Sequence, residues 1–256
     1  MCPRIMNPNS VSHKVRVLYS FPHKLGASRI CYIAWQQVNG LAAAGADVLV
    51  CPGAVSRSSP PEVRVWPTLA MGKLRIPYKL IGSMRAFALH DLIVSHRLER
   101  LAGKIDIVHT WPLGALRTLK TAQRLGIPAV LERPNAHTRF AYQVVKDECN
   151  RLGVELPANH EHAFKPEVLR IEEEEYALAT RLLCPSDFVV KTFLDEGFQR
   201  NRLARHIYGV DERILSRLSK TTGSPLHHDL CRGLCGAERP SLCAGGMVEI
   251  PSEPAR

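Results

Sequence analysis

Apolar segments with β-strand character alternate with helix-like segments from about residue 14 to about residue 212 of this 256-residue chain. In the clearest unit, an apolar run over 105–109 is followed by a helix-like stretch over 114–125, the stop residue Gly126 and a second apolar run over 127–132. Continuous apolar strands joined by helices are typical of a parallel sheet that is covered on both faces. The sequence therefore predicts an α/β fold with a doubly wound parallel sheet.

The other elements follow from the same patterns of apolar residues and turn residues. We expect further strands at 15–19, 48–51, 63–66, 181–184 and 203–207, which makes six or seven strands in all. We expect further helices at 30–44, 77–101, 168–179 and 186–196, the last capped by Ser186 and stopped by Gly197.

The alternating pattern stops near Lys220. Gly, Pro and Ser make up 12 of the last 36 residues, and no helix or strand period remains there. Residues 1–220 carry a formal charge of +11 and the remainder a charge of −1, so the basic character belongs to the patterned part. We expect a flexible N-terminus at 1–13, a folded domain at 14–212, and a linker followed by a disordered tail at 213–256.

Composition excludes several classes of protein. No apolar run approaches the roughly 20 residues of a membrane span, and residues 1–10 lack the apolar core of a signal peptide. The eight cysteines show no disulfide framework, which suits reduced thiols and a cytoplasmic location. Zinc-finger and helix-turn-helix signals are absent, so nucleic acid is not an expected partner. No metal is expected either, because the ligand spacing is incomplete in the tail, at His227, His228, Cys231, Cys235 and Cys243.

Two charged stretches each allow two interpretations. A basic stretch could rest at the periphery of a membrane on anionic headgroups, although a solvated helix face is favoured. Its members are Lys73, Arg75, Lys79, Arg85, Arg97, Arg100 and Lys104. For the acidic run Glu172–Glu175 a solvated face is again favoured, because four consecutive residues spread around a helix.

Polar residues gather where ligands bind in open α/β sheets, at the carboxyl ends of the strands. His109 ends one predicted strand, and Arg133, Asn135 and His137 follow the next one. A lone histidine is more often structural than catalytic, but this position favours a site. The arrangement does not specify a reaction.

The loop after the first strand, residues 21–29, contains Gly26 and several basic residues. It lacks the G-x-G-x-x-G pattern, which disfavours a dinucleotide cofactor. Two interpretations remain open: a tight turn from strand to helix, or a loop that lies close to a phosphate or an acceptor.

The ordered set of these segments resembles the N-terminal half of glycosyltransferase family 4, whose enzymes have the two-domain GT-B fold. The matching segments are 15–29, 33–42 with Gly45 and Val48, 106–109, 133–138, 184–189 and 208–211. Such a domain is Rossmann-like and binds the acceptor, while the second domain of the family binds a nucleotide-diphospho-sugar. The donor-domain motifs of the family do not appear after residue 211.

The resemblance implies a transferase that moves a hexose from a nucleotide sugar to an acceptor hydroxyl without a cofactor. It implies His109 as the catalytic candidate, and Gly26, Arg133, Asn135 and His137 as substrate-binding residues. We expect this chain to be truncated before the donor domain and to be inactive alone. The alternative is a non-catalytic Rossmann-like domain that binds a nucleotide, a glycan or a partner.

A frameshift would explain the tail. When residues 237–247 are written back as codons and read one base later, they can yield a string that looks like the opening of the family's donor domain. Codon choice leaves freedom in this reading. The frameshift is therefore a hypothesis that resequencing the encoding DNA would test.

Overall fold

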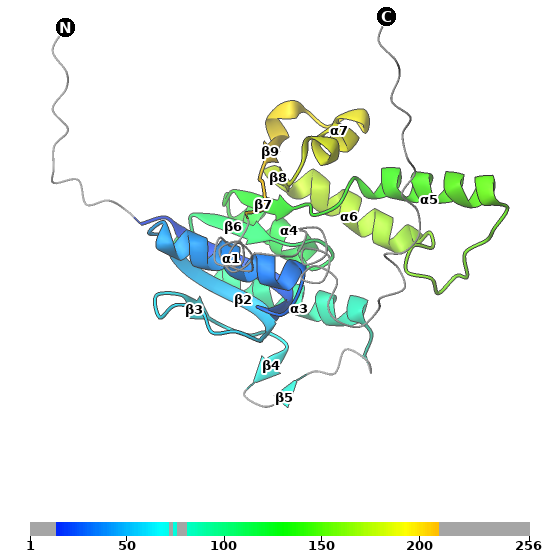
Figure 1. The fold of residues 1–256 in the computed structure, drawn as a ribbon. Coiled ribbons are helices and arrows are strands. Elements are labelled where there is room, and N and C mark those ends of the chain that lie inside the picture. Colours follow the sequence, from blue (N-terminus) through cyan, green and yellow to red (C-terminus); the bar gives the residue numbers. More distant parts are fainter. Residues whose placement is uncertain (1–13, 72–73, 76–80, 210–256) are drawn as a thin grey trace, which may run out of the picture. The chain divides into compact units, whose positions relative to one another are not determined.

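A seven-stranded parallel sheet forms the centre of the domain in this computed structural model (Figure 1). The structure describes residues 14–71, 74–75 and 81–209. The sheet strands are β1 Arg16–Leu25, β2 Asp47–Val55, β3 Arg64–Val65, β6 Ile107–Thr110, β7 Ala129–Glu132, β8 Arg181–Cys184 and β9 Leu203–Arg205. A separate antiparallel pair consists of β4 Ala70–Met71 and β5 Leu74–Arg75.

The sheet has the order β3-β2-β1-β6-β7-β8-β9. The chain builds outward from β1 to β3 and then returns to the other side of β1, so the order reverses between β1 and β6. Ligands bind beside such a reversal in open α/β sheets, at the carboxyl ends of the strands. The predicted doubly wound, Rossmann-like parallel sheet is confirmed, with the larger of the two expected strand numbers.

Helices cover both faces of the sheet (Figure 1). Leu18 and its neighbour Tyr19 belong to two different core clusters, because successive side chains of a strand point to opposite faces. The Tyr19 face packs against α1, and the Leu18 face packs against α3, α4, α6 and α7. The helices are α1 Ile30–Ala43, α3 Ser83–Arg100, α4 Leu116–Arg124, α5 Thr138–Leu152, α6 Pro166–Leu178 and α7 Asp187–Asp195, with a 3-10 turn at Arg200–Arg202.

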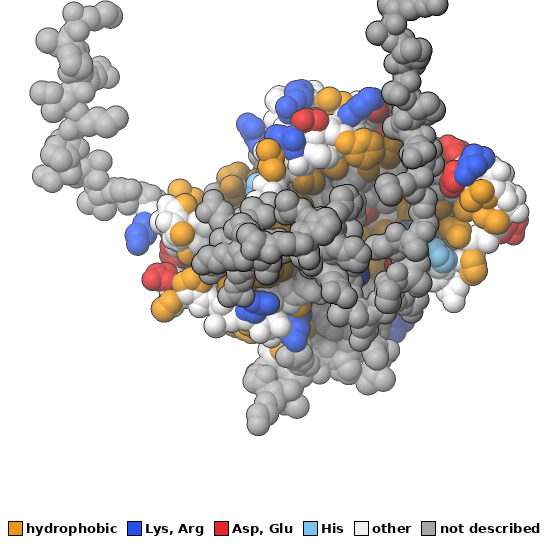
Figure 2. Space-filling view, in the orientation of Figure 1, with side chains coloured by type: hydrophobic (Ala, Val, Ile, Leu, Met, Phe, Trp, Pro, Cys, Tyr) orange, Lys and Arg blue, Asp and Glu red, His pale blue; other side chains and the backbone are white. Residues whose placement is uncertain are grey.

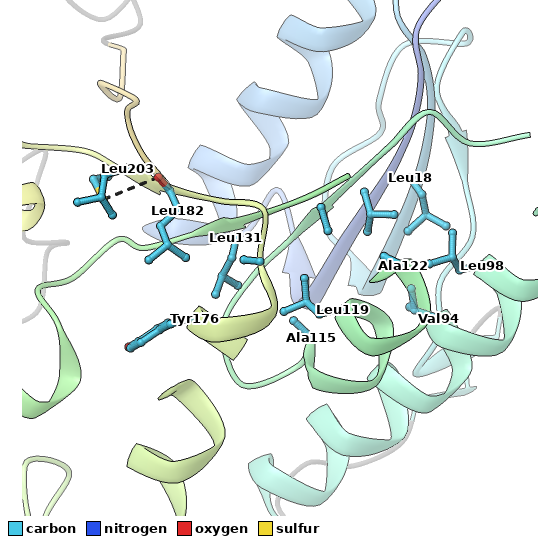
Figure 3. Packing of buried hydrophobic residues seen from close by; sticks show 14 of the residues in the cluster. Leu18, Val94, Leu98, Ala115, Leu119, Ala122, Leu131, Tyr176, Leu182 and Leu203 are labelled. Atoms are coloured by element: carbon cyan, nitrogen blue, oxygen red, sulfur yellow. Dashed lines mark hydrogen bonds between the residues drawn. The ribbon is translucent and has the colours of Figure 1, made fainter. Parts of the chain in front are cut away.

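The larger core lies between the sheet and α3, α4 and α6. Figure 3 shows Leu18, Leu131 and Leu182 of three strands facing Leu119 of α4 and Leu98 of α3. All five side chains are fully buried. Burying a leucine side chain contributes about 1.5–3 kcal/mol, so this layer holds the strands of the site in register.

Local signals set the ends of α7 as predicted. The Ser186 hydroxyl accepts a hydrogen bond from the Val189 backbone N–H at 3.2 Å, which satisfies one of the free N–H groups of the first turn. Gly197 follows the helix with a φ of 85°, a conformation that glycine adopts without strain.

Several boundaries differ from the sequence prediction, two of them by five residues or more. β1 continues through a register shift as far as Leu25, so the expected loop after residue 19 begins later. The helix expected at 77–101 is α3, which begins at Ser83 after Gly82 at φ 80°, while Leu74–Arg75 belong to β5. Residues 76–80 lie outside the described residues.

Helix α5 was not predicted, because polar and charged residues outnumber the apolar ones in its sequence. Only Thr138 of its 15 residues is buried, and Val144 and Leu152 are exposed. Figure 1 shows α5 reaching away from the sheet, and apolar side chains are visible at that end of the molecule in Figure 2. A helix that packs on a core usually has one apolar side. Helix α5 packs only weakly on its neighbours, since Thr138 is its one buried residue.

None of the helices in the described part of the chain is long and apolar enough to cross a membrane. The chain divides into two units between Tyr208 and Gly209. The predicted flexible N-terminus and the predicted tail with its candidate frameshift lie outside the described residues. Their boundaries stay predictions.

Candidate functional site

His109 lies at the carboxyl end of β6, beside the reversal of strand order. Its register partner in β1 is Tyr19, and the centroids of the two rings are 4.4 Å apart. The residue is 8% exposed, so the imidazole is almost enclosed. Its Nε2 atom is 3.2 Å from Oε1 of Glu132. The structure therefore places His109 at the expected edge of the sheet, in a polar network.

Glu132, the last residue of β7, gathers four polar side chains around a fully buried carboxylate. Its Oε1 atom accepts from Gln37 Nε2 at 2.8 Å and from His109 Nε2 at 3.2 Å. Its Oε2 atom accepts from the Tyr208 hydroxyl at 3.3 Å. His206 Nδ1 is 3.0 Å from Oε1 but lacks hydrogen-bond geometry, so we interpret this contact as electrostatic.

The neighbours of Glu132 keep it ionised. Burial alone would raise its pKa, because burial disfavours the charged form. The imidazoles of His109 and His206 outweigh this effect and lower the pKa of Glu132 to about 2. The contact with the carboxylate in turn raises the pKa of His206. The centre of the network is thus a carboxylate that can only accept hydrogen bonds.

A line of hydrogen bonds reaches Glu132 from the α1 side of the sheet. Trp111 Nε1 donates to the Tyr19 hydroxyl at 2.8 Å, and this hydroxyl donates to Gln37 Oε1. The Gln37 amide nitrogen then donates to Glu132. An indole nitrogen can only donate, so the direction of the whole line is fixed.

Arg133 follows Glu132 directly but lies on the opposite face of the sheet. It is 2% exposed, and its Nη1 atom donates to Glu172 Oε1 at 2.6 Å. Its guanidinium carbon lies 4.5 Å from the ring centroid of Tyr176. These contacts tie β7 to α6. A role of Arg133 in binding substrate stays a prediction.

His137 precedes α5 and is 2% exposed. Its Nδ1 atom accepts the Arg139 backbone N–H at 3.2 Å, and its ring packs on Tyr176 and Phe193. Burial lowers the pKa of His137 to about 4. Asn135 is exposed in the same loop. The structure does not bring His109 and His137 together, because their contacts lie on different faces of the sheet; substrate contacts of His137 and Asn135 stay predictions.

Gly26 allows a close contact within the chain. Its φ is 79°, and a Cβ at this position would lie 2.7 Å from the Arg57 Cβ. Arg57 Nε also donates to the Gly26 carbonyl at 2.9 Å. The requirement for glycine is therefore explained by Arg57. The predicted approach of this loop to a ligand stays a prediction.

The expectation that the acidic run Glu172–Glu175 is a solvated face is wrong for two of its members. Glu172 is 7% exposed and Glu175 is fully buried. Residues three apart share one side of a helix, and this side of α6 faces Arg133 and the start of α4. Burial raises the pKa of Glu175 to about 8, although two backbone N–H groups bond to it.

Those two N–H groups belong to the segment that leads into α4. Glu175 accepts from Leu113 at 2.8 Å and from Ala115 at 3.0 Å. Asp91 of α3 accepts two further N–H groups, at 2.7 and 2.9 Å. Carboxylates are favoured at the start of a helix, where N–H groups lack helical partners. Both therefore act as caps of α4.

Sequence reasoning identified the edge of the site but not its organisation. Glu132 carries a visible signal, since it is a carboxylate at the end of an apolar strand. Gln37, Tyr19 and His206 carry none, because each comes from an element distant in sequence. Within the described segments, no group of three or more His, Cys, Asp and Glu residues could hold a metal ion.

A model of Glycosyltransferase Family 4 matches residues 33–213, which is more than half of the chain. This range contains Gln37, His109, Glu132 and His206. No curated protein sequence matches the chain.

Solved structures share the fold at low sequence identity. Sucrose-phosphate synthase from Thermosynechococcus elongatus has a TM-score of 0.53 and 14% identity, over 78% of this chain and 49% of that chain. Phytolacca americana UGT2, complexed with UDP-2fluoro-glucose and pterostilbene, has a TM-score of 0.51 and 13% identity, over 81% of this chain and 57% of that chain. The chain thus spans about half the length of these structures.

Proposed function

This chain belongs to glycosyltransferase family 4, and from that premise we propose that its domain is the acceptor-binding half of a hexosyltransferase. The complete enzyme would move a hexose from a nucleotide sugar to an acceptor hydroxyl. The plant structure of the same fold is complexed with UDP-2fluoro-glucose and pterostilbene. Ligands of these two kinds are the proposed partners.

One observation carries the proposal: a nearly enclosed histidine at the strand-order reversal, held by a buried carboxylate. His109 Nε2 bonds to Glu132, and the ring lies against Tyr19 at a tilt of 30°. Such a histidine can bond to a hydroxyl of the acceptor or of the transferred sugar. Positioning of this kind accounts for a large share of the rate in transfer reactions.

We expect no transfer by this chain alone. It spans 49% and 57% of the two solved structures, so the groups that would hold a donor diphosphate are proposed to lie in a second half. Binding of the acceptor cannot replace stabilisation of the departing diphosphate. Rapid turnover of nucleotide sugars by the purified chain would contradict this division of labour.

The test of function fuses this domain to the donor domain of another family 4 enzyme and measures turnover with a panel of nucleotide sugars. We expect His109→Gln to lower kcat/KM by roughly tenfold to a thousandfold, because contacts felt in the transition state are lost. The matched control is His96→Gln, since His96 is exposed on α3. Equal activity of both variants would overturn the assignment of His109. Tight glycan binding without any turnover would favour a non-catalytic binding domain.

Contact with a membrane is a separate proposal. Arg85, Arg97 and Arg100 lie on α3, and Lys104 follows it. Arg97 stacks over the Trp66 ring at 4.7 Å, so it is partly engaged within the domain. Lys73 and Lys79 lie outside the described residues. Peripheral membrane contact and a cytoplasmic location stay predictions. Sedimentation with anionic vesicles would test the membrane contact.

A further inference from the structure

The contacts of Glu132 fix which nitrogen of His109 carries the proton. An ionised carboxylate has no hydrogen to donate, and a pKa of about 2 keeps Glu132 ionised at neutral pH. The hydrogen bond between His109 Nε2 and Glu132 Oε1 must therefore use a proton on Nε2. In the neutral imidazole, which has a single N–H, this arrangement leaves Nδ1 of His109 as an acceptor.

Glu132 is itself held in place. Gln37 donates to Oε1 at 2.8 Å, and the orientation of its amide is set by the Tyr19 hydroxyl. Tyr208 donates to Oε2. Rotation of the carboxylate would break bonds to both oxygens and leave buried polar groups without partners, which is unfavourable. The carboxylate is thus a fixed reference point for the imidazole.

Tyr19 fixes the plane of the His109 ring. The two rings are tilted by 30° with centroids 4.4 Å apart, and Tyr19 is fully buried. Among the described residues, His109 Nδ1 has no hydrogen-bond partner, in contrast to Nε2. The His109 ring thus has a fixed orientation, and its Nδ1 atom is free to accept a hydrogen bond from a ligand.

We propose that Glu132 is the positioning residue of the site: it holds His109 as the Nε2-protonated tautomer, so that Nδ1 accepts a hydrogen bond from a sugar hydroxyl. This inference rests on the proposed function for the identity of the ligand, but not for the tautomer. A carboxylate that orients an imidazole in this way is a general device in group-transfer sites. Glu132 acts through His109 and does not touch the substrate.

The test measures the tautomer directly, by long-range proton–nitrogen correlation NMR on the chain with ¹⁵N-labelled histidine at pH 7.5. The spectrum of His109→Gln assigns the His109 signals. We expect wild-type His109 to be protonated on Nε2, with Nδ1 at the chemical shift of an unprotonated nitrogen. Predominant protonation on Nδ1, alone or together with Nε2, would overturn the proposal, whether or not any variant folds.

The variant Glu132→Gln tests the cause. Its amide can donate or accept, so we expect the fraction of Nδ1-protonated His109 to rise severalfold. Glu175→Gln is the matched control, because Glu175 is an equally buried carboxyl whose bonds go to the start of α4. An unchanged tautomer in folded Glu132→Gln would show that Glu132 does not position His109.

A titration with methyl glycosides, followed in the same spectra, separates this inference from the proposed function. We expect binding to move the His109 Nδ1 signal in the wild-type chain by an amount that falls severalfold in Glu132→Gln. The expected tautomer without any glycoside response would count against sugar binding at this edge and leave the role of Glu132 intact. A glycoside response with the opposite tautomer would reject the positioning role alone.

Discussion

Arg133 and Tyr176 form a buried cation–π pair, in which the guanidinium carbon lies 4.5 Å from the ring centroid. Glu172 completes the arrangement, because its carboxylate balances the charge of Arg133 at 2.6 Å. A paired charge of this kind is tolerated in the interior, but a single one is not. The contact between β7 and α6 therefore depends on keeping both partners.

Arg133→Met should lower the free energy of unfolding by about 3–5 kcal/mol, since it leaves Glu172 buried without its partner. Urea unfolding followed by circular dichroism measures the change. The control Arg139→Met breaks the exposed pair with Glu173 and should cost less than about 1 kcal/mol. A double variant, Arg133→Met with Glu172→Leu, should recover part of the loss, because no unpaired charge remains. Equal losses in the two single variants would contradict this account.

His137→Ala should lower the free energy of unfolding by about 2 kcal/mol, because it removes a helix cap and aromatic packing. The same urea experiment measures it. His96→Ala, on the exposed side of α3, should change stability by less than about 0.5 kcal/mol. If His137→Ala unfolds at the wild-type urea concentration, the ring contributes nothing to stability and the packing account of His137 is wrong.

Stability should fall in acid because of His90. This fully buried imidazole lies between Ser20 Oγ at 2.9 Å and Thr68 Oγ1 at 2.6 Å, and burial lowers its pKa to about 3. An unfolded histidine titrates near 6.5. Between pH 6.5 and 3 the unfolded chain therefore binds a proton at His90 that the folded chain does not bind. The stability present above pH 6.5 is lost as the pH falls towards 3. The slope is about 1.4 kcal/mol per pH unit for one such group.

Glu175 produces the opposite trend on the other limb of the profile. Its folded pKa of about 8 lies above the ordinary value near 4.3 for glutamate. Its contribution to the free energy of unfolding is complete below about pH 4.3 and is lost progressively as the pH rises through 8. The two trends cancel between about pH 4.3 and 6.5, so urea midpoints from pH 3 to 9 should show a plateau there and fall on both sides of it. His90→Gln should flatten the acid limb without changing the alkaline limb, and an unchanged acid limb would assign the loss to other groups.

Gly26→Ala should destabilise the domain by about 1–3 kcal/mol, because φ is 79° and the new Cβ would meet Arg57. Gly40→Ala is the matched control. Gly40 lies inside α1, and nothing within 4 Å would meet its Cβ. Alanine should there stabilise the helix by about 0.5–1 kcal/mol. The melting temperatures of the two variants should shift in opposite directions. A higher melting temperature for Gly26→Ala would show that the chain accommodates both the positive φ and the contact with Arg57 without cost.

The centre of the sheet could be predicted from the sequence because its strands contain short apolar runs. The runs at 105–109 and 127–132 became β6 Ile107–Thr110 and β7 Ala129–Glu132, which pair in parallel on either side of the predicted helix in sequence. Helix α5 was missed because charged residues interrupt its apolar ones, although Tyr142, Val145 and Cys149 lie at helical spacing and are half-buried. Length and periodicity detect only those helices that bury one face.

The site was predicted only as far as position along a strand reveals it. His109 was placed correctly at the edge, and Arg133 and His137 were expected beside it. Successive side chains of a strand point to opposite faces of the sheet. Glu132 therefore contacts His109 on one face, while Arg133 contacts Glu172 of α6 on the other. The partners from α1 and from the segment after β9 required the folded chain, because no sequence spacing connects Gln37, Glu132 and His206.

The caps of α4 also bear on which ligands could bind at this edge of the sheet. A helix that begins beside the carboxyl end of a parallel strand commonly offers free N–H groups to a phosphate. In this domain the carboxyl groups of Glu175 and Asp91 already accept hydrogen bonds from four such N–H groups. A phosphate could use those N–H groups only by displacing a carboxyl group, so a pyrophosphate bound at this edge would need its counter-charges elsewhere.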